Sequence, residues 1–374
     1  MNQAKSAVGT ADPHQPALLS LPSMDRLSAL LVVALASTLH AAEEPKLSPL
    51  PIPVSNNAVA ITRAGKEAKI FSFMGIGPKR TWDATTNQAF QMELNTGKWT
   101  EVRPVPGVAG RLAASAAALH EQVVLIGGYV VDSLGGETTV SDVNVYVPLE
   151  NRWYRGVDTP TPVDDSVIGI YRDRYVYLIG GWSKTDPVRN VQIYDTEKDK
   201  WLQATPIPGT PVFGHAGAIV GDTILYIDGA YKNPNGPNPK YVASNECWMG
   251  KINHSDITRI EWTKLPDHPG SAHYRIAAGA SDKDNKIYFS GGTDNPYNHN
   301  GIGYNGQPSE PSPVTFAFNL RSGKWETINE NTPEPTMDHR GLLVTHRGLL
   351  LVGGMAKGQQ VTPNVAIVKS TPGK

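Results

Sequence analysis

Short apolar runs that end in glycine recur along the whole chain. The residues of each run are wholly apolar or alternate with polar ones, and turn residues separate one run from the next. Runs of this kind predict buried β-strands. Six of them end in a glycine pair or its remnant: Phe73–Gly75, Leu125–Gly128, Leu178–Gly181, Tyr226–Gly229, Phe289–Gly292 and Leu351–Gly354. The pattern predicts one β-unit that is used six times.

A tryptophan follows five of the six glycine signals, and a strand with an aromatic residue, such as Val191–Asp195, precedes it. The five are Trp99, Trp153, Trp201, Trp262 and Trp325, at steps of 54, 48, 61 and 63 residues. Four short strands in a unit of about 50 residues are typical of a propeller blade. We therefore predict an all-β fold, a six-bladed β-propeller. Its double glycine, tyrosine and tryptophan resemble the kelch repeat.

The sixth unit is incomplete at the end of the chain. Its glycine pair precedes one further strand, Asn364–Val368, but no tryptophan. At the other end, Leu47–Val54 looks like the tail that follows each tryptophan, for example Leu265–Pro269. We predict that an N-terminal strand closes the last blade, because closure removes free sheet edges. Residues 45–370 then form a single propeller domain.

The first 42 residues have the order of a signal peptide. Met24 opens a short charged region, an apolar run covers Leu27–Ala36, and small residues fill Ser37–Ala42. The run is too short to span a membrane as a helix. We expect a periplasmic or secreted protein with no membrane span in the mature chain. Residues 1–23 are either a long leading region or lie upstream of the true start, and a buried N-terminal helix is the other interpretation of the apolar run.

Charge and cysteine content exclude several classes of function. The chain has 34 basic and 35 acidic residues, a net charge of −1, and 40% hydrophobic residues. Such a balance gives no electrostatic footprint for nucleic acid. The single cysteine, Cys247, excludes an internal disulfide framework and a cysteine-cluster metal site. No phosphate-binding glycine loop or nucleophile motif occurs in the sequence.

A propeller gathers the starts of its innermost strands around one axis, so candidate site residues should lie there. Three arginines among them suit a ligand that carries a carboxylate, because guanidinium binds carboxylate in bidentate fashion. This favours an anionic sugar, and the alternative is that these polar groups only solvate the channel. The positions just before each innermost strand are Asn57, Arg111, Asp165, His215, Arg275 and Arg340, with His273, Asp338 and His339 close by.

Metal ligation is weakly supported by the sequence. His273 and His339 come from neighbouring blades and could meet, but no spacing typical of a metal motif occurs. We expect no metal and no cofactor.

Two long polar segments, Tyr231–Ser244 and Thr293–Pro313, follow the fourth and fifth glycine signals. Loops of this length either bind a ligand or are poorly ordered.

Several stretches near the start resemble the bacterial family of cyclically permuted mutarotases and N-acetylneuraminate epimerase. They are Leu50–Val54, Gly75–Gly77, Lys98–Thr100, Pro106–Gly107 with Arg111, Ser115–Ala116, Asp142–Tyr146 and Trp153. The resemblance implies a periplasmic kelch propeller that interconverts sialic acid anomers by acid/base catalysis, with Arg111 as a substrate contact. The position of the family's catalytic glutamate holds Ala230, which cannot move a proton. Asp228 shares a strand face with it and is the expected replacement.

The expected function is therefore that of a secreted mutarotase- or epimerase-like isomerase for an acidic sugar such as N-acetylneuraminate. Arg111, Arg275 and Arg340 would hold the carboxylate. Asp228, Asp165 and His215 are the candidate catalytic groups, and Asn57, His273 and His339 are further substrate contacts. The alternative is a non-catalytic kelch module that binds a glycan or a protein. A copper oxidase of the galactose oxidase type is excluded, because Cys247 has no matching tyrosine and histidine partners.

Overall fold

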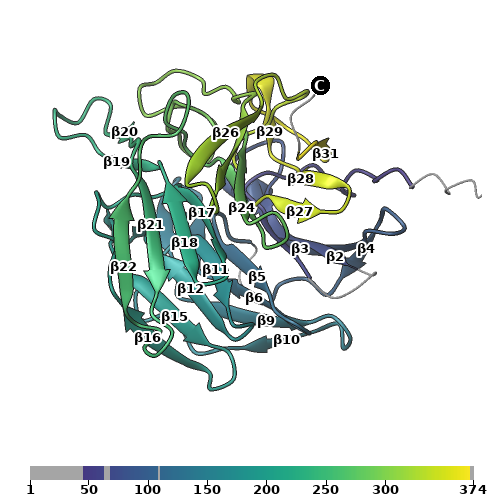
Figure 1. Ribbon diagram of the computed structural model, residues 1–374. Helices are drawn as coiled ribbons and strands as arrows, with labels where there is room; N and C mark the ends of the chain where they lie inside the picture. Colours follow the sequence, from purple (N-terminus) through teal and green to yellow (C-terminus); the bar gives the residue numbers. More distant parts are fainter. Residues whose placement is uncertain (1–44, 63–67, 108–109, 371–374) are drawn as a thin grey trace, which may run out of the picture. The chain divides into compact units, whose positions relative to one another are not determined.

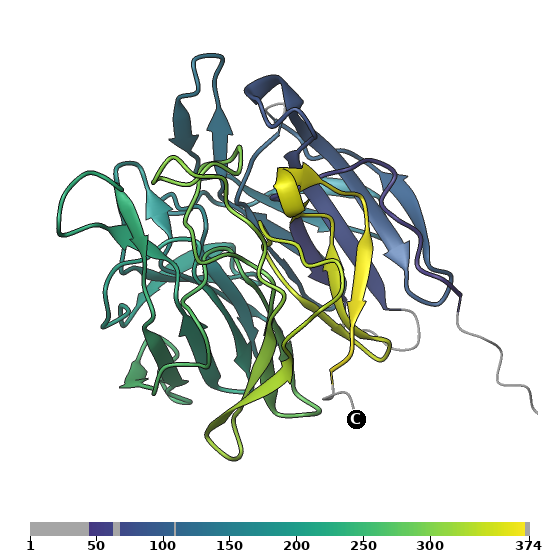
Figure 2. The same ribbon diagram turned by 90° about the horizontal axis from the view of Figure 1, so that it is seen from above.

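The structure is a computed structural model that describes residues 45–62, 68–107 and 110–370. Six antiparallel sheets follow one another along the described chain and are arranged around a common axis (Figures 1 and 2). The predicted all-β, six-bladed propeller is confirmed. The predicted signal peptide lies outside the described residues. Within the described ranges, none of the helices is both long and apolar enough to cross a membrane.

The first three blades each have four strands, which run in sequence order from the axis outward. Blade 1 consists of β1 (Ala58–Ile61), β2 (Lys69–Ile76), β3 (Thr85–Glu93) and β4 (Lys98–Val102). Blade 2 consists of β5 (Ser115–Ala118), β6 (Val123–Ile126), β9 (Val143–Val147) and β10 (Arg152–Arg155). Blade 3 consists of β11 (Val167–Tyr171), β12 (Tyr175–Ile179), β15 (Val191–Asp195) and β16 (Lys200–Ala204).

Blades 4 and 5 repeat this order, whereas blade 6 has three strands. Blade 4 consists of β17 (Ala216–Val220), β18 (Thr223–Ile227), β21 (Cys247–Ile252) and β22 (Ile260–Lys264). Blade 5 consists of β23 (Ala277–Ser281), β24 (Lys286–Ser290), β25 (Thr315–Asn319) and β26 (Lys324–Asn329). Blade 6 consists of β27 (Leu343–Thr345), β28 (Gly348–Val352) and β31 (Val365–Val368).

Small hairpins or turns connect the second and third strands of blades 1 to 4 and of blade 6, a longer segment connects them in blade 5, and together they crown one face of the propeller. The strand pairs are β7 (Tyr129–Val131) with β8 (Glu137–Thr139), β13 (Trp182–Ser183) with β14 (Asp186–Pro187), β19 (Ala230–Lys232) with β20 (Tyr241–Ala243), and β29 (Met355–Ala356) with β30 (Gln360–Val361). Two 3-10 turns, η2 (Trp82–Ala84) and η3 (Lys357–Gln359), belong to blades 1 and 6. We call this face the crown.

The core lies between neighbouring blades. Phe73 of blade 1 packs against Tyr146 and Trp153 of blade 2, with ring centroids 6.1 Å and 5.4 Å apart. The second strands are wholly apolar where both faces are covered, as in β6. The innermost strands are rich in alanine and glycine, because the blades approach one another most closely near the axis.

Each tryptophan of the repeat ties its blade to the one before it. Its indole N–H donates a hydrogen bond to a backbone carbonyl in the tail that follows the outer strand of the preceding blade. The pairs are Trp99 with Ser48 (3.0 Å), Trp153 with Arg103 (2.8 Å), Trp201 with Val157 (2.8 Å), Trp262 with Thr205 (3.4 Å) and Trp325 with Pro266 (2.9 Å). Ser48 therefore takes the place that the tail of a preceding blade takes elsewhere.

The N-terminal segment closes the ring as a tail and not as a strand. The amide of Leu50 donates to the carbonyl of Pro363 (2.7 Å), and the amide of Gly354 donates to the carbonyl of Val54 (2.9 Å). These bonds join the segment to blade 6, but it has no strand assignment. The predicted N-terminal closing strand is thus not confirmed, since blade 6 has three strands among the described residues.

The first glycine of each pair is required at the contact between blades. Gly291 has φ of 78°, and a β-carbon there would overlap the carbonyl oxygen of Thr336 in the next blade's leading segment. Gly323, in the turn between β25 and β26, has φ of 66° but would meet nothing within 4 Å. The two glycines share a backbone conformation and differ in their surroundings.

We expect Gly291→Ala to lower the free energy of unfolding clearly more than Gly323→Ala. Both changes place alanine in the left-handed region, which costs about 1–2 kcal/mol. Only the first also forces a steric overlap, and overpacking adds about 1–3 kcal/mol. Chemical denaturation of the two variants measures the difference. Equal losses would contradict the assignment of Gly291 to a tight contact between blades.

Candidate functional site

One residue from each blade forms a ring around the axis, just before the innermost strand. All six have left-handed backbone conformations, with φ between 51° and 72°. Backbone bonds connect them, for example from the amide of Gly214 to the carbonyl of Asp165 (2.9 Å) and from the amide of Arg275 to the carbonyl of Gly214 (2.8 Å). The six, which we call the axial ring, are Asn56, Ala113, Asp165, Gly214, Arg275 and Asp338.

The axial ring differs from the six positions predicted from the sequence. Asp165 and Arg275 belong to both sets, whereas Asn57, His215 and Arg340 lie one or two residues after the ring position of their blade and Arg111 lies two residues before it. The difference arises because a residue with left-handed backbone lies between the segment that enters each blade and its innermost strand. The start of an apolar run therefore does not mark the same backbone position in every blade.

Two arginines and two aspartates form a buried network on the axial ring. Arg275 donates to Asp165 through Nη2 (2.6 Å) and to Asp338 through Nη1 (3.0 Å). Arg340 also bridges the two carboxylates, through Nη1 to Asp165 and through Nη2 to Asp338 (3.5 Å). Each side chain is at most 4% exposed. The two positive and two negative charges balance.

Burial and charge act in opposite directions on these groups. Burial alone would raise the pKa of Asp165, but attraction to Arg275 and Arg340 outweighs it and lowers that pKa. Burial would also lower the pKa of Arg275, and its carboxylate neighbours raise it well above the ordinary value. In the neighbouring Asp164, burial and the charge of Asp165 raise the pKa and outweigh the hydrogen bond from Thr139 and the attraction of Arg275, which lower it. The pKa shifts of Asp165 and Arg275 thus both favour the ionised forms of this pair.

The long segment after β24 covers the network from the crown side. The hydroxyl of Tyr297 donates to Asp338 Oδ1 (3.2 Å), and the guanidinium of Arg275 lies 5.3 Å from the Tyr297 ring centroid. Further along, Arg80 of blade 1 donates to the carbonyl of Asn300 (2.7 Å). Thr293–Pro313 is therefore a lid with defined contacts, which we call the axial lid.

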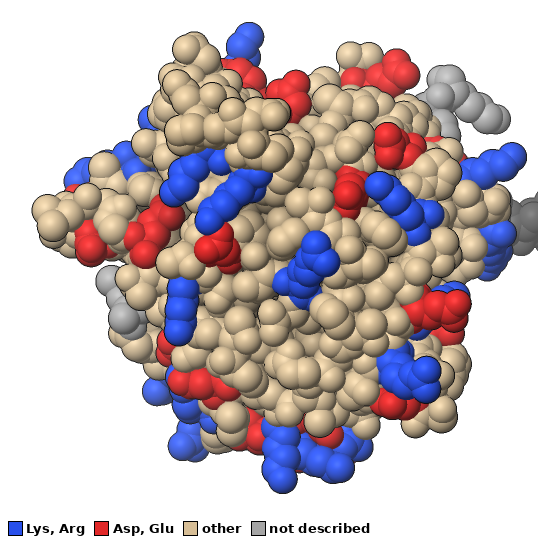
Figure 3. All heavy atoms as spheres, turned by 90° about the vertical axis from the view of Figure 1, so that its left-hand side faces the viewer, with Lys and Arg blue, Asp and Glu red and all other residues tan. Residues whose placement is uncertain are grey.

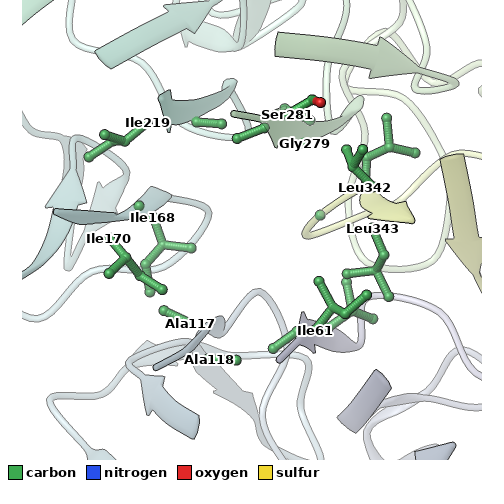
Figure 4. Close-up of a pocket in the computed structure, with 18 of the residues that line it drawn as sticks. Ile61, Ala117, Ala118, Ile168, Ile170, Ile219, Gly279, Ser281, Leu342 and Leu343 are labelled. Atoms are coloured by element: carbon green, nitrogen blue, oxygen red, sulfur yellow. The ribbon is translucent and has the colours of Figure 1, made fainter. Parts of the chain in front are cut away.

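A cavity of about 750 Å³ lies along the axis beside the ring, lined by residues of all six innermost strands. Figure 4 shows mainly apolar side chains around it, among them Ile61, Ile168, Ile170 and Ile219. Of the predicted site residues, His215, His339 and Arg340 line this cavity. Polar residues also line the cavity, among them Ser166, Ser281, Asp282, Lys283 and Asp284.

Three of the predicted substrate-contact or catalytic residues, His215, His339 and Asn57, make hydrogen bonds within the protein. Nε2 of His215 bonds to the carbonyl of Ile179 (3.0 Å), and Nε2 of His339 to Thr336 Oγ1 (2.8 Å). Asn57 donates to Ser72 Oγ (2.8 Å).

Arg111 lies apart from the other two arginines. It donates to Asn144 Oδ1 (2.9 Å) and is 3.6 Å from Asp142, while its Nε has no partner. Burial lowers the pKa of Arg111 to about 10.

Asp228 and His273 meet in a second buried cluster with His268, which the sequence analysis did not single out. Nε2 of His268 is 2.9 Å from both carboxylate oxygens of Asp228, and the amide of His273 donates to Oδ2 (2.8 Å). Asp228 stands where blades 2, 3, 5 and 6 have the first glycine of the pair, and that departure from the repeat was the available signal. Ala230, two residues on, packs among aromatic residues such as Phe213 and Tyr274.

The charges on one face of the propeller are mixed in sign. Figure 3 shows acidic and basic side chains interspersed on the side that lies to the left in Figure 1.

Large apolar side chains are exposed at two crown positions in neighbouring blades: Trp82 in η2 is 49% exposed and Leu134 in the β7–β8 turn is 95% exposed. The two loops meet where Ala84 and Val131 pack on one apolar cluster. We call the positions of Trp82 and Leu134 the rim of the crown.

The comparisons with known proteins agree with this architecture. The family described as "KLHDC2/KLHL20/DRC7 Kelch-repeats domain" matches residues 58–292, and the chain belongs to the kelch-repeat family. The kelch-like protein terF of Aspergillus terreus is 23% identical over 71% of this chain and 55% of its own length. Kelch-like protein 15 of Gallus gallus is 32% identical over 30% of this chain and 22% of its own length. The chain therefore spans about half or less of these relatives.

Two further similarities cover more of both proteins. N-acetylneuraminate epimerase 1 of Escherichia coli is 22% identical over 81% of this chain and 87% of its own length. A solved structure titled "Structure of YjhT" aligns with a TM-score of 0.67 at 17% identity, over 87% of this chain and 98% of the other. The structural likeness supports the fold, and the suspected resemblance to the epimerase family is confirmed as distant homology.

Acid should destabilise the protein through two buried histidines. Burial lowers the pKa of His215 and of His339 to about 4, whereas an exposed histidine titrates near 6.5. The unfolded chain then binds more protons between pH 6.5 and 4, so the free energy of unfolding falls as pH falls through this window. We expect each histidine to remove on the order of 3 kcal/mol.

Urea unfolding at pH 7 and pH 4.5 measures this loss. In His339→Gln, whose amide can keep the bond to Thr336, the difference between the two pH values should shrink. His120→Gln, at an exposed histidine, is the matched control and should leave the difference unchanged. An unchanged pH difference in His339→Gln would show that this imidazole does not titrate in the window.

Proposed function

We propose that this kelch-repeat protein is a non-catalytic module that binds a protein partner at the rim of its crown. One observation carries the proposal: the axial arginines are already paired with Asp165 and Asp338, while large apolar side chains are exposed nearby on the crown. Kelch propellers commonly act as binding modules, and the kelch-like relatives are consistent with that use. The function is then carried by loops on a rigid scaffold.

The geometry of the rim supports a protein partner rather than a small sugar. Trp82 and Leu134 project from two loops that are connected to the axial lid: Arg80 bonds to Asn300, and His299 bonds to Glu137 of the same hairpin as Leu134 (3.0 Å). Exposed tryptophan surrounded by polar groups is typical of an interface anchor. A partner with a complementary apolar pair would bury both side chains.

The second candidate is sugar mutarotation, favoured by the coverage of the N-acetylneuraminate epimerase relative. For this activity a substrate carboxylate would have to displace Asp165 or Asp338 from the arginines, and the axial lid would have to open. Arg111 does not contact the axial carboxylates and is the more available guanidinium, since its partners are Asn144 and Asp142. Asp228 is the candidate acid or base in place of Ala230, although it is engaged with His268.

Export from the cytoplasm is part of the proposal. Its support is the order of charged, apolar and small residues before Glu43 in the sequence. The partner would then be a periplasmic or extracellular protein.

Loss of the two rim side chains should weaken partner binding. A photo-crosslinking amino acid at position 134 identifies the partner in the native source, and the purified partner is then titrated against variants. We expect Trp82→Ala to weaken binding about 30-fold, as for an anchor residue worth about 2 kcal/mol, and Leu134→Ser to weaken it less. Leu202→Ser, at an exposed leucine on outer strand β16, is the control and should bind normally.

Two results would count against the binding module. Unchanged affinity in both rim variants would exclude the rim as the docking site. Acceleration of N-acetylneuraminate anomerisation, followed by NMR and lost in Arg111→Ala, would instead support the second candidate. The proposal expects no acceleration.

A further inference from the structure

A second buried site lies between blades 4 and 5. Asp228, His268 and His273 offer ligand atoms that all lie within 4.8 Å of one another, and all three residues are buried. We propose that this cluster binds one divalent first-row transition metal ion, with Zn²⁺ as the preferred ion. Two imidazoles and one carboxylate are a donor set that such ions accept.

The distances between ligand atoms approach those that a metal ion requires. With metal–ligand bonds near 2.0–2.1 Å, tetrahedral geometry places ligand atoms about 3.4 Å apart. Nε2 of His268 is 2.9 Å from Asp228 Oδ1, and Nδ1 of His273 is 3.7 Å from Asp228 Oδ2. Shifts of a few tenths of an ångström bring these pairs to the required spacing. The fourth tetrahedral position remains for a water molecule.

The other ring nitrogens are held as in known metal sites. Nδ1 of His268 lies 2.9 Å from the carbonyl of Pro269, and Nε2 of His273 lies 3.2 Å from Ser312 Oγ. Such outer bonds fix the tautomer and direct the free nitrogen at the metal. The His268 ring is further fixed by stacking on Phe316, with centroids 4.7 Å apart. The imidazoles are therefore oriented before any ion binds.

One ligand atom is left without a partner inside the protein. Nδ1 of His273 is buried and makes no hydrogen bond among the described residues, and the side chain is 2% exposed. A buried polar atom without a partner costs about 1–3 kcal/mol. A metal ion between His273 and Asp228 would remove that cost.

The repeat itself points to Asp228. The equivalent residue is Met74 in blade 1 and a glycine in blades 2, 3, 5 and 6 (Gly127, Gly180, Gly291 and Gly353), each with a positive φ. Asp228 keeps this conformation, with φ of 62°, although a side chain is disfavoured there. Strained residues persist mainly where they serve a site. Here the replacement places a carboxylate between two histidines from the segment that leads into blade 5.

Cobalt titration of the metal-stripped full-length chain tests the site. Co²⁺ bound by two imidazoles and a carboxylate gives visible absorption, so the spectrum reports the ligands directly. We expect saturation at one equivalent, displacement by Zn²⁺, and a higher unfolding midpoint with Zn²⁺. His273→Gln should weaken binding at least tenfold. His254→Gln removes a histidine of an exposed histidine–aspartate pair and should bind as the parent does.

Two outcomes would overturn the proposal. Absence of saturable absorption in the parent chain means that Asp228 and His268 form an ion pair without metal. Equal binding in His273→Gln assigns the ion to other histidines. A crystal soaked in Zn²⁺ gives a test that needs no variant: an anomalous peak between Asp228, His268 and His273 supports the site, and a peak elsewhere or none contradicts it. Neither readout depends on the proposed partner.

Discussion

The balanced pairing of Arg275 and Arg340 with Asp165 and Asp338 is the interaction on which the centre of this propeller depends. Charges buried to this degree are tolerated only when each is paired and hydrogen bonded. The axial ring supplies the backbone positions of Asp165, Arg275 and Asp338, and Tyr297 of the axial lid donates to Asp338 Oδ1. The arginines are thereby occupied, and this is why the proposed function places recognition at the rim of the crown.

Ring closure follows from a second repeated contact. Five indole N–H groups bind the tails of preceding blades, and Ser48 accepts the bond from Trp99 as Arg103 accepts it from Trp153. The N-terminal segment thus joins the first blade to the last although it is not a strand. A family relationship to kelch proteins is consistent with this use of tryptophan.

The sequence predicted the repeat, the number of blades and the presence of charged residues near the axis, because glycine pairs and tryptophans recur at every blade contact. It did not predict the register at the axis, since the left-handed residue that sets it can be Asn, Ala, Asp, Gly or Arg. It also did not predict that Arg275 and Arg340 meet carboxylates, or that His268 reaches Asp228. Such contacts join different blades and leave no local pattern in the chain.

The central claim is that the axial arginines and aspartates hold the fold together and are not a ligand site. The free energy of unfolding of Asp165→Asn, compared with that of Asp158→Asn at an exposed ion pair, tests it most directly. Breaking a buried pair on one side costs about 3–5 kcal/mol, so we predict a loss of that size for Asp165→Asn and little change for the control. An unchanged or increased stability, as expected when a charge kept for ligand binding is removed, would contradict the account.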